Sequence, residues 1–224
     1  VEMKKLGIFV LYVSMNSVDA EKNDAVRGYR GHLEHVMRVL DLCRKHGLDV
    51  VLPITTSKPL LADTIELLDF SRKNGFTANI GLFAPTGRAE GRHEELFDDE
   101  FWKTLRELYD RNPGLRGDWD TNLTLEVGCP AGYEKLHVSP YGDVTGCSLQ
   151  PVSFGNVRET PLTEIVAKMR GFRHFEKRAP SCIMALDREF IGDYVDFSMQ
   201  HPSTPYPVEL NPHWEADCGG RVKR

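Results

Sequence analysis

The residues whose type and spacing could do chemistry in this sequence are its cysteines. Three of the five, Cys129, Cys147 and Cys182, follow the spacing C-x17-C-x34-C. A tetrahedral zinc ribbon usually draws its ligands from closely spaced C-x2–4-C pairs, which the sequence lacks, whereas an iron–sulfur cluster accepts more scattered thiolates. Spacing alone leaves two interpretations open, a metal cluster and a set of unrelated buried thiols.

The other two cysteines carry weaker signals. Cys43 lies on the apolar face of a predicted helix, which is typical of a small core residue. Cys218 lies near the end of the chain, before Gly219 and Gly220. Because the cysteine count is odd and no export signal is visible, a disulfide framework is disfavoured, and a metal-binding or reactive role is favoured.

Composition and charge exclude several classes of protein. Among the 224 residues, 41% are apolar and 27% are charged, which is typical of a globular protein with a sizeable core. The longest apolar run covers ten residues, 6–15, whereas a membrane-spanning helix needs roughly 20. The net charge of −5 argues against binding to duplex nucleic acid, which normally requires a basic face. We therefore expect a cytoplasmic protein with no nucleic-acid partner and no membrane partner.

The first half of the sequence alternates between strand and helix patterns. Continuous apolar, β-branched runs predict strands at 6–14, 49–56 and 77–84. Apolar residues at helical spacing predict helices at 31–47, from Pro59 to about Gly75, and from Asp98 to Asn112. This alternation predicts parallel strands with right-handed crossovers, as in half of a barrel or a small doubly wound sheet.

Polar residues follow each of these strands, at 14–17, 55–57 and 85–88. In parallel α/β folds, ligands bind at the carboxyl ends of strands, so these residues are candidates for a binding site. The alternative is that they only form loops and helix caps.

The second half follows a different pattern, and the change falls near residues 114–122. Alternating residues from Leu136 and a turn at 141–143 predict a hairpin that ends at Cys147. Helices are predicted after Thr160-Pro161 and at 187–197, followed by a proline-containing tail from Ser198 that we expect to be extended. Four glycines near the cysteines allow close backbone approach and N–H donors towards sulfur: Gly128, Gly132, Gly142 and Gly146.

Two segments resemble the radical S-adenosylmethionine (SAM) superfamily. The stretch CPAGYEKLHVSPYGDVTGCSLQPVSFGNVRETPLTEIVAKMRGF (129–172), with Cys182 beyond it, resembles the SPASM or twitch extension of these enzymes. Residues 13–52 resemble a mid-barrel strand and its successor, with matches at Asn23-Asp24, Arg27-Gly28 and Gly31. The resemblance covers roughly residues 8 to 195, and the two segments occur in the order that the family shows.

The resemblance implies a fold class of α/β, with a partial (β/α) radical-SAM-type barrel at 1–117, a small α+β SPASM/twitch domain at 118–197 and a tail at 198–224. The sequence lacks the C-x3-C-x2-C motif with which the family holds the cluster that cleaves SAM. We therefore expect the chain to begin about three βα units late, at roughly 30 residues per unit. The strand at 7–14 would then lack a neighbour and be less buried than 50–54.

The resemblance also implies cofactors and their binding residues. Cys129, Cys147 and Cys182 would hold an auxiliary 4Fe–4S cluster, whose fourth iron is either open to substrate or bound by Cys218. SAM would bind in the full-length protein through residues at the ends of the middle strands. The candidates are Ser14 and Asn16 for the ribose, Arg27 for the carboxylate and Arg88 as a carboxylate or substrate clamp. The alternatives are loop caps for Ser14 and Asn16 and a bridge from Arg27 to Asp24.

Two departures from the family pattern narrow the function. A full SPASM domain carries closely spaced cysteines for a second auxiliary cluster, which this sequence lacks, so one auxiliary cluster is the most that we expect. Several members carry an aspartate that acts as a base directly after the cysteine that corresponds to Cys147, whereas this sequence has Ser148. An activity that needs this carboxylate, such as sulfatase maturation, is therefore disfavoured.

The sequence thus predicts the C-terminal part of a radical SAM enzyme that modifies a peptide or a cofactor precursor. Its partners would be a peptide or small-molecule substrate and an electron donor such as a flavodoxin or ferredoxin. No catalytic residue is assigned. Two alternatives remain, a non-catalytic iron–sulfur binding or electron-transfer module and a plain α/β binding protein with structural thiols.

Overall fold

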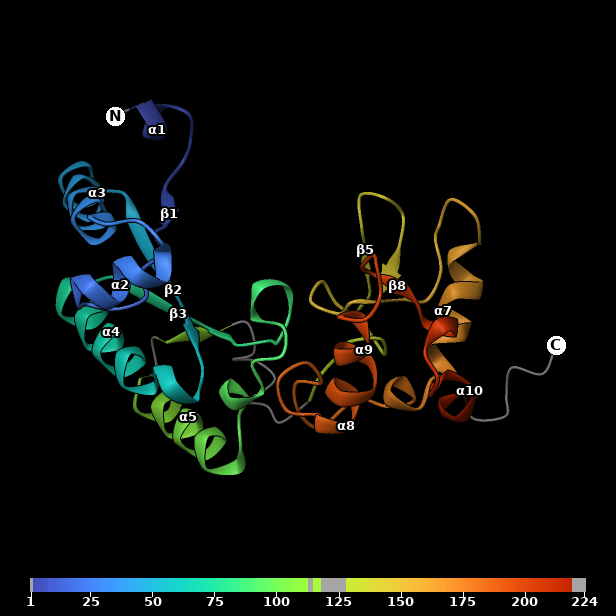
Figure 1. The fold of residues 1–224 in the computed structure, drawn as a ribbon. Coiled ribbons are helices and arrows are strands. Elements are labelled where there is room, and N and C mark those ends of the chain that lie inside the picture. Colours follow the sequence, from blue (N-terminus) through green and yellow to red (C-terminus); the bar gives the residue numbers. More distant parts are fainter. Residues whose placement is uncertain (1, 113–114, 118–127, 219–224) are drawn as a thin grey trace. The chain divides into compact units, whose positions relative to one another are not determined.

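The computed structural model describes residues 2–112, 115–117 and 128–218, and these fall into two compact units (Figure 1). The first unit lies within 1–83 and 97–120, and the second within 84–96 and 121–224. The segment from Ala84 to Leu96 therefore packs with the second half of the chain, although it follows a strand of the first unit.

A parallel sheet forms the centre of the first unit. Its strands pair in chain order, β1 (Val10–Tyr12), β2 (Asp49–Thr56), β3 (Thr77–Leu82) and β4 (Arg116–Gly117). The register aligns Val10 with Asp49, Val51 with Thr77 and Asn79 with Arg116. The predicted parallel α/β order is confirmed, and within the described residues the sheet is open rather than a closed barrel.

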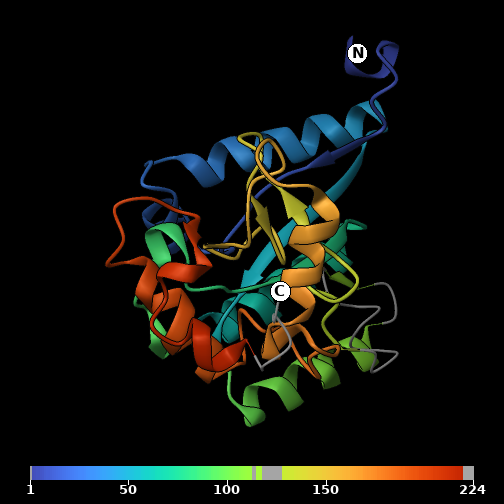
Figure 2. The same ribbon diagram turned by 90° about the vertical axis from the view of Figure 1, so that its right-hand side faces the viewer.

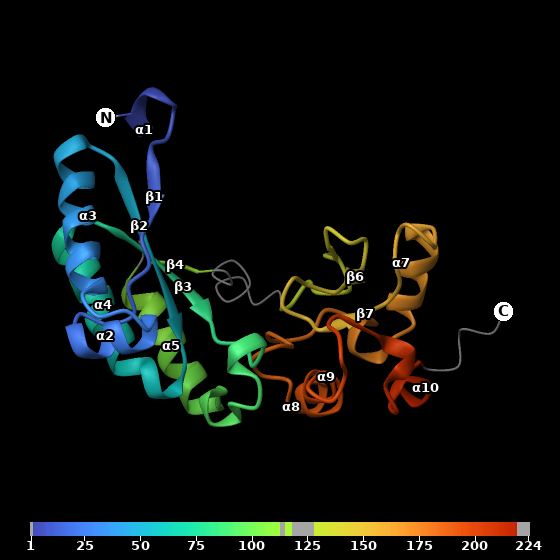
Figure 3. The ribbon, with the colours of Figure 1, turned by 45° about the horizontal axis from the view of Figure 1, so that its top comes forward.

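The helical elements of this unit are α1 (Glu2–Lys5), α2 (Ala20–Arg27), α3 (His32–His46), the 3-10 turn η1 (Lys58–Leu60), α4 (Leu61–Asn74) and α5 (Asp99–Arg111). Of these, α3, α4 and α5 lie where the apolar spacing predicts helices, whereas α1 and α2 were not predicted. The helix α3 packs on β2, and α4 packs on β2 and β3, along one side of the sheet (Figure 3). Asp98 caps α5 by accepting the Phe101 N–H, as its acidic start predicts.

The edge strand β1 is much more exposed than its neighbour β2. Phe9 and Tyr12 are 66% and 65% exposed, whereas Leu52 of β2 is fully buried. Among the described residues, β1 pairs with β2 alone. The expected difference in burial between 7–14 and 50–54 is therefore confirmed.

Short elements and long loops build the second unit. The predicted hairpin pairs β5 (His137–Val138) with β6 (Val144–Thr145), and β7 (Val152–Ser153) pairs with β8 (Tyr206–Pro207). Figure 2 shows α7 (Leu162–Arg170), in orange, beside the strands in yellow. The remaining elements are η2 (Gly87–Ala89), η3 (His93–Glu95), η4 (Arg173–Phe175), α8 (Arg188–Phe190), the π-helix η5 (Ile191–Val195), α9 (Asp196–Ser198), η6 (Val208–Leu210) and α10 (Trp214–Asp217).

An aromatic cluster forms the core of the second unit, and the end of the chain folds against it. Phe172 lies about 5 Å, ring to ring, from both Phe175 and Tyr194. Tyr206 is fully buried, and its hydroxyl donates to the Tyr194 carbonyl at 2.9 Å. The prediction of an extended tail from Ser198 was therefore wrong for the described residues, because Tyr206 and Val208 bury apolar surface that the proline count does not reveal.

Candidate metal centre

The backbone segment before Cys182 pairs with the backbone at Cys129 through Ala179. The Cys129 N–H donates to the Ala179 carbonyl at 2.6 Å, and the two residues form an antiparallel bridge. Gly128 permits this pairing, because it adopts a φ of +72° and a Cβ there would lie 2.2 Å from the Ala179 oxygen. The backbone contact therefore brings two cysteines that are distant in sequence into one region.

The hairpin delivers the third cysteine to the same region. Cys147 follows β6, and the Thr145 hydroxyl donates to its carbonyl at 2.7 Å. The Gly132 N–H donates to the Gly146 carbonyl at 3.3 Å and so ties the turn after Cys129 to the residue before Cys147. A side chain at Gly132 would collide with the Phe175 ring, 2.2 Å from its Cβ. The two loops can therefore meet only with glycine at this position.

The thiols of Cys129, Cys147 and Cys182 lie within electrostatic range of one another. Burial raises the pKa of all three, and the Cys129 thiol raises those of Cys147 and Cys182 further. The charges of Lys135 and Arg178 act in the opposite direction on the pKa of Cys129. Without a bound metal, the three thiols therefore stay protonated at neutral pH.

Nearby backbone N–H groups lower the pKa of these thiols and so favour their anionic form. They belong to Ala131 and Ile183 for Cys129, to Leu149 and Gln150 for Cys147, and to Met184 and Ala185 for Cys182. The glycines near the cysteines clear space, as predicted, but the N–H donors come from these other residues.

This donor set fits an iron–sulfur cluster. Thiolates that accept backbone N–H bonds are the usual ligands of such clusters, and these bonds help to set the reduction potential. Within the described residues, no group of three or more His, Cys, Asp or Glu side chains could hold a single metal ion. A cluster is consistent with this result, because each thiolate binds a different iron rather than one shared metal ion.

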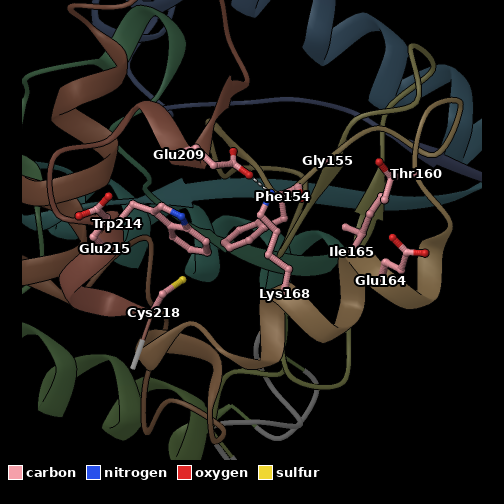
Figure 4. Close-up of a pocket in the computed structure, with 10 residues that line it drawn as sticks. All are labelled: Phe154, Gly155, Thr160, Glu164, Ile165, Lys168, Glu209, Trp214, Glu215 and Cys218. Carbon is pink, nitrogen blue, oxygen red and sulfur yellow. Dashed lines mark hydrogen bonds and ion pairs between the residues drawn. The ribbon is translucent and has the colours of Figure 1, made fainter. Parts of the chain in front are cut away.

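Cys218 lies in a different part of the second unit. It borders a pocket of about 580 Å³ whose floor includes Phe154, Ile165 and Trp214 (Figure 4). Lys168 crosses this pocket to pair with Glu209, and its ammonium lies 5.8 Å from the Trp214 ring centre. The structure therefore does not bring Cys218 to the other three cysteines. Cys43 is buried in α3 of the first unit, as expected.

Three of the predicted SAM-binding residues lie in the first unit. Ser14 is exposed after β1, and Asn16 is half-buried, with its N–H donating to Asn23 Oδ1 at 3.0 Å. The Oδ1 atom of Asn16 is buried and has no partner among the described residues. Arg27, at the end of α2, is exposed. Arg88 lies in η2, which belongs to the second unit, and is also exposed.

The Asn23-Asp24 pair of the motif positions the loop after β1. Asp24 accepts the N–H groups of Leu33 and Gly31, which lower its pKa and join α2 to α3. The alternative in which Arg27 pairs with Asp24 is not observed. Asn23 in turn accepts the Asn16 N–H. These residues therefore shape the candidate SAM site rather than line it.

Two buried polar residues near the predicted sites, Asp63 and Gln150, were not predicted from the sequence. The buried Ser17 hydroxyl donates to Asp63 Oδ1 at 2.6 Å, and Lys22 pairs with the same carboxylate at 3.3 Å. Gln150 is buried close to Cys147, and its side-chain amide has no partner among the described residues. A charged or amide residue within an otherwise apolar segment was the signal available for both.

Comparison with known proteins identifies the class of the second unit. Residues 129–184 match the SPASM family, described as an iron–sulfur cluster-binding domain. This range includes Cys129, Cys147 and Cys182. The chain therefore contains a SPASM iron–sulfur domain, and the resemblance to radical SAM proteins is confirmed.

The relatives are of two kinds. The chain is 27% identical over 203 residues to the AdoMet-dependent heme synthase of Nitratidesulfovibrio vulgaris, covering 77% of this chain and 55% of that protein. It is 23% identical over 161 residues to the antilisterial bacteriocin subtilosin biosynthesis protein AlbA of Bacillus subtilis, covering 66% of this chain and 35% of AlbA. The chain thus spans about half the length of the heme synthases that it matches.

Solved structures of Streptococcus suis SuiB also align with the chain. The SuiB complex with precursor peptide SuiA gives a TM-score of 0.49 at 15% identity, covering 73% of this chain and 44% of SuiB. None of the described helices has the length and apolar character needed to cross a membrane.

Proposed function

We propose that this chain is the C-terminal part of a radical SAM enzyme and that Cys129, Cys147 and Cys182 bind its auxiliary 4Fe–4S cluster. The observation that supports this proposal is the group of three thiols inside the SPASM match, two of them buried and one half-buried, in which Cys129 raises the pKa of the other two. In this assignment residues 1–117 are a partial barrel, 118–197 the SPASM domain and 198–224 the C-terminal tail.

Three of the four irons of the cluster would be bound by cysteines of this chain. The three thiolates bind three irons, and Cys218 lies in a different pocket, so the fourth iron is left without a cysteine ligand from the described residues. A bound cluster supplies a site that binds substrate or passes an electron. Lys135 and Arg178 place positive charge beside Cys129, which favours retention of an anionic group there.

The candidate SAM site belongs to the first unit. Asn16 Oδ1 is a buried acceptor that lacks a donor among the described residues, and a ribose hydroxyl would satisfy it. Ser14 would contribute a second hydroxyl contact, and Arg27 would pair with the SAM carboxylate. Arg88 is assigned to the substrate or to a second carboxylate.

The relatives suggest the class of substrate. One group of them makes heme, and AlbA takes part in the biosynthesis of a bacteriocin. We assign this chain a cofactor precursor or a peptide as substrate, modified by radical chemistry, with a flavodoxin or ferredoxin as electron donor. The runner-up is a non-catalytic iron–sulfur binding or electron-transfer module.

Anaerobic reconstitution tests the cluster assignment. The 224-residue chain, incubated with iron, sulfide and a thiol reductant, should bind about four irons and four sulfides and absorb broadly near 400 nm. A chain that binds no iron would support a plain α/β protein with structural thiols. Tight SAM binding by the loaded chain, measured by calorimetry and weakened in Asn16→Ala, would favour the enzyme over the electron-transfer module.

A further inference from the structure

Gln150 is a buried amide without a partner. Its side chain is 5% exposed, and neither Nε2 nor Oε1 has a hydrogen-bond partner among the described residues. Leaving a buried donor or acceptor unpaired costs roughly 1–3 kcal/mol, and native proteins rarely tolerate it. A polar group that the protein itself does not supply would therefore stabilise this position.

Gln150 is built into the turn that orients the Cys147 thiol. Its backbone N–H donates to the Cys147 carbonyl at 3.2 Å. Its side chain packs over Gly146, where a Cβ would lie 2.4 Å from Oε1 and 2.7 Å from the Phe175 ring. Because the residue that immediately precedes Cys147 is glycine, the amide can lie over the backbone next to a proposed cluster ligand.

We propose that the Gln150 carboxamide donates an Nε2–H hydrogen bond to a sulfur of the auxiliary cluster. This inference rests on the proposed function, since the acceptor is a cluster sulfide or a cluster-bound thiolate. Among the described residues, no other group accepts from Nε2, and cluster sulfurs are acceptors of this kind. Gln150 is therefore a residue that tunes the cluster rather than a ligand of it.

The hydrogen bond has a predictable effect on the electron-transfer equilibrium. It stabilises the reduced cluster more than the oxidised one, because reduction adds negative charge to the sulfurs. Gln150→Met keeps the length of the side chain and removes the donor. At a fixed solution potential, the ratio of reduced to oxidised cluster should fall about threefold to tenfold in this variant, the effect of one ordinary hydrogen bond.

Gln150→Met should have opposite effects on the stability of the cluster-free chain and on retention of the cluster in the loaded chain. In the cluster-free chain the amide has no acceptor, so Gln150→Met removes an unpaired buried group, and the melting temperature should stay the same or rise. In the loaded chain the same substitution should speed loss of the cluster to an iron chelator. Gln200→Met, at an exposed position, is the matched control and should change neither property.

The decisive measurement is an EPR-monitored redox titration of the loaded 224-residue chain, with deuterium exchange to detect a proton coupled to the cluster. The proposal predicts a more negative midpoint and a lost exchangeable coupling in Gln150→Met, and the same in Gln150→Leu. An unchanged midpoint and coupling in a fully loaded variant would overturn it. A wild-type chain that takes up no iron would instead refute the proposed function, and the iron count before each titration separates the two outcomes.

Discussion

At the scale of residues, the surroundings of Cys218 differ from those of the other three cysteines of the second unit. Cys129, Cys147 and Cys182 act on one another's pKa and accept backbone N–H groups, whereas the charges that act on Cys218 belong to Lys168, Asp217 and Glu209. Cys218 therefore has the chemistry of an isolated thiol. Its reactivity can be predicted separately from cluster binding.

Alkylation of Cys218 should depend steeply on pH. Burial raises the pKa of this thiol to about 11, so the thiolate fraction grows about tenfold for each pH unit between 7 and 10. The Lys168 charge lowers this pKa, so Lys168→Met should raise it and slow alkylation. Mass spectrometry of iodoacetamide adducts measures the rate, with Lys177→Met as an exposed control. A rate that is independent of pH, or faster alkylation in Lys168→Met, would contradict this picture.

Residue types and spacing predicted the cysteine group but not its surroundings. Cys129, Cys147 and Cys182 stood out because thiols are rare and the sequence around them resembled a known family. Gln150 and Asp63 did not, because an amide or a carboxylate is common in any sequence and only burial distinguishes these two. Burial depends on residues far away in the chain, so it could not be inferred from local spacing.

At the scale of elements, glycine at 128 allows the segment before Cys182 to cross Cys129. Gly128→Ala would force an unfavourable positive φ and a contact of 2.2 Å with the Ala179 carbonyl. The variant should lose roughly 1–3 kcal/mol of stability and bind less iron. Gly192→Ala is the control, because its Cβ would meet nothing within 4 Å and alanine favours a helix. Urea unfolding and iron counts check both, and equal stability of the two variants would count against the crossing.

Apolar patterns predicted the long elements better than the short ones. The strand β2 spans the predicted 49–56, because residues 50–54 form a continuous apolar run, of which Val50, Leu52 and Ile54 are buried. The helix α2 was not predicted as an element, because its sequence AEKNDAVR has no apolar stripe and its start depends on the Asp19 cap. The fold of residues 198–218 depends on Tyr206 reaching Tyr194, a contact that no local period encodes.

At the scale of the whole molecule, the exposed β1 edge predicts self-association. Its side chains include Phe9 and Tyr12, and strand edges with apolar side chains invite pairing with other chains. The 224-residue chain should elute as concentration-dependent oligomers in size-exclusion chromatography, and Phe9→Lys with Tyr12→Lys should shift it towards monomer. Leu42→Lys, at an exposed apolar position of α3, should have little effect. A monodisperse monomer at high concentration would contradict the prediction.

The alternation of strands and helices predicted the parallel order of the sheet, because sequential βα units pair in order. It could not predict that residues 84–96 pack with the second unit. That packing depends on contacts such as His93 with Asp196 at 2.8 Å, which join residues far apart in sequence.

The central claim is that three particular cysteines hold one cluster, and the iron content of five Cys→Ser variants tests it most directly. The account predicts that C129S, C147S and C182S each lose most of the iron and the absorption near 400 nm after reconstitution. It predicts that C43S and C218S keep about four irons per chain, as the unmodified chain does. Full iron content in any of the first three variants, or loss of the cluster in C218S alone, would contradict the account.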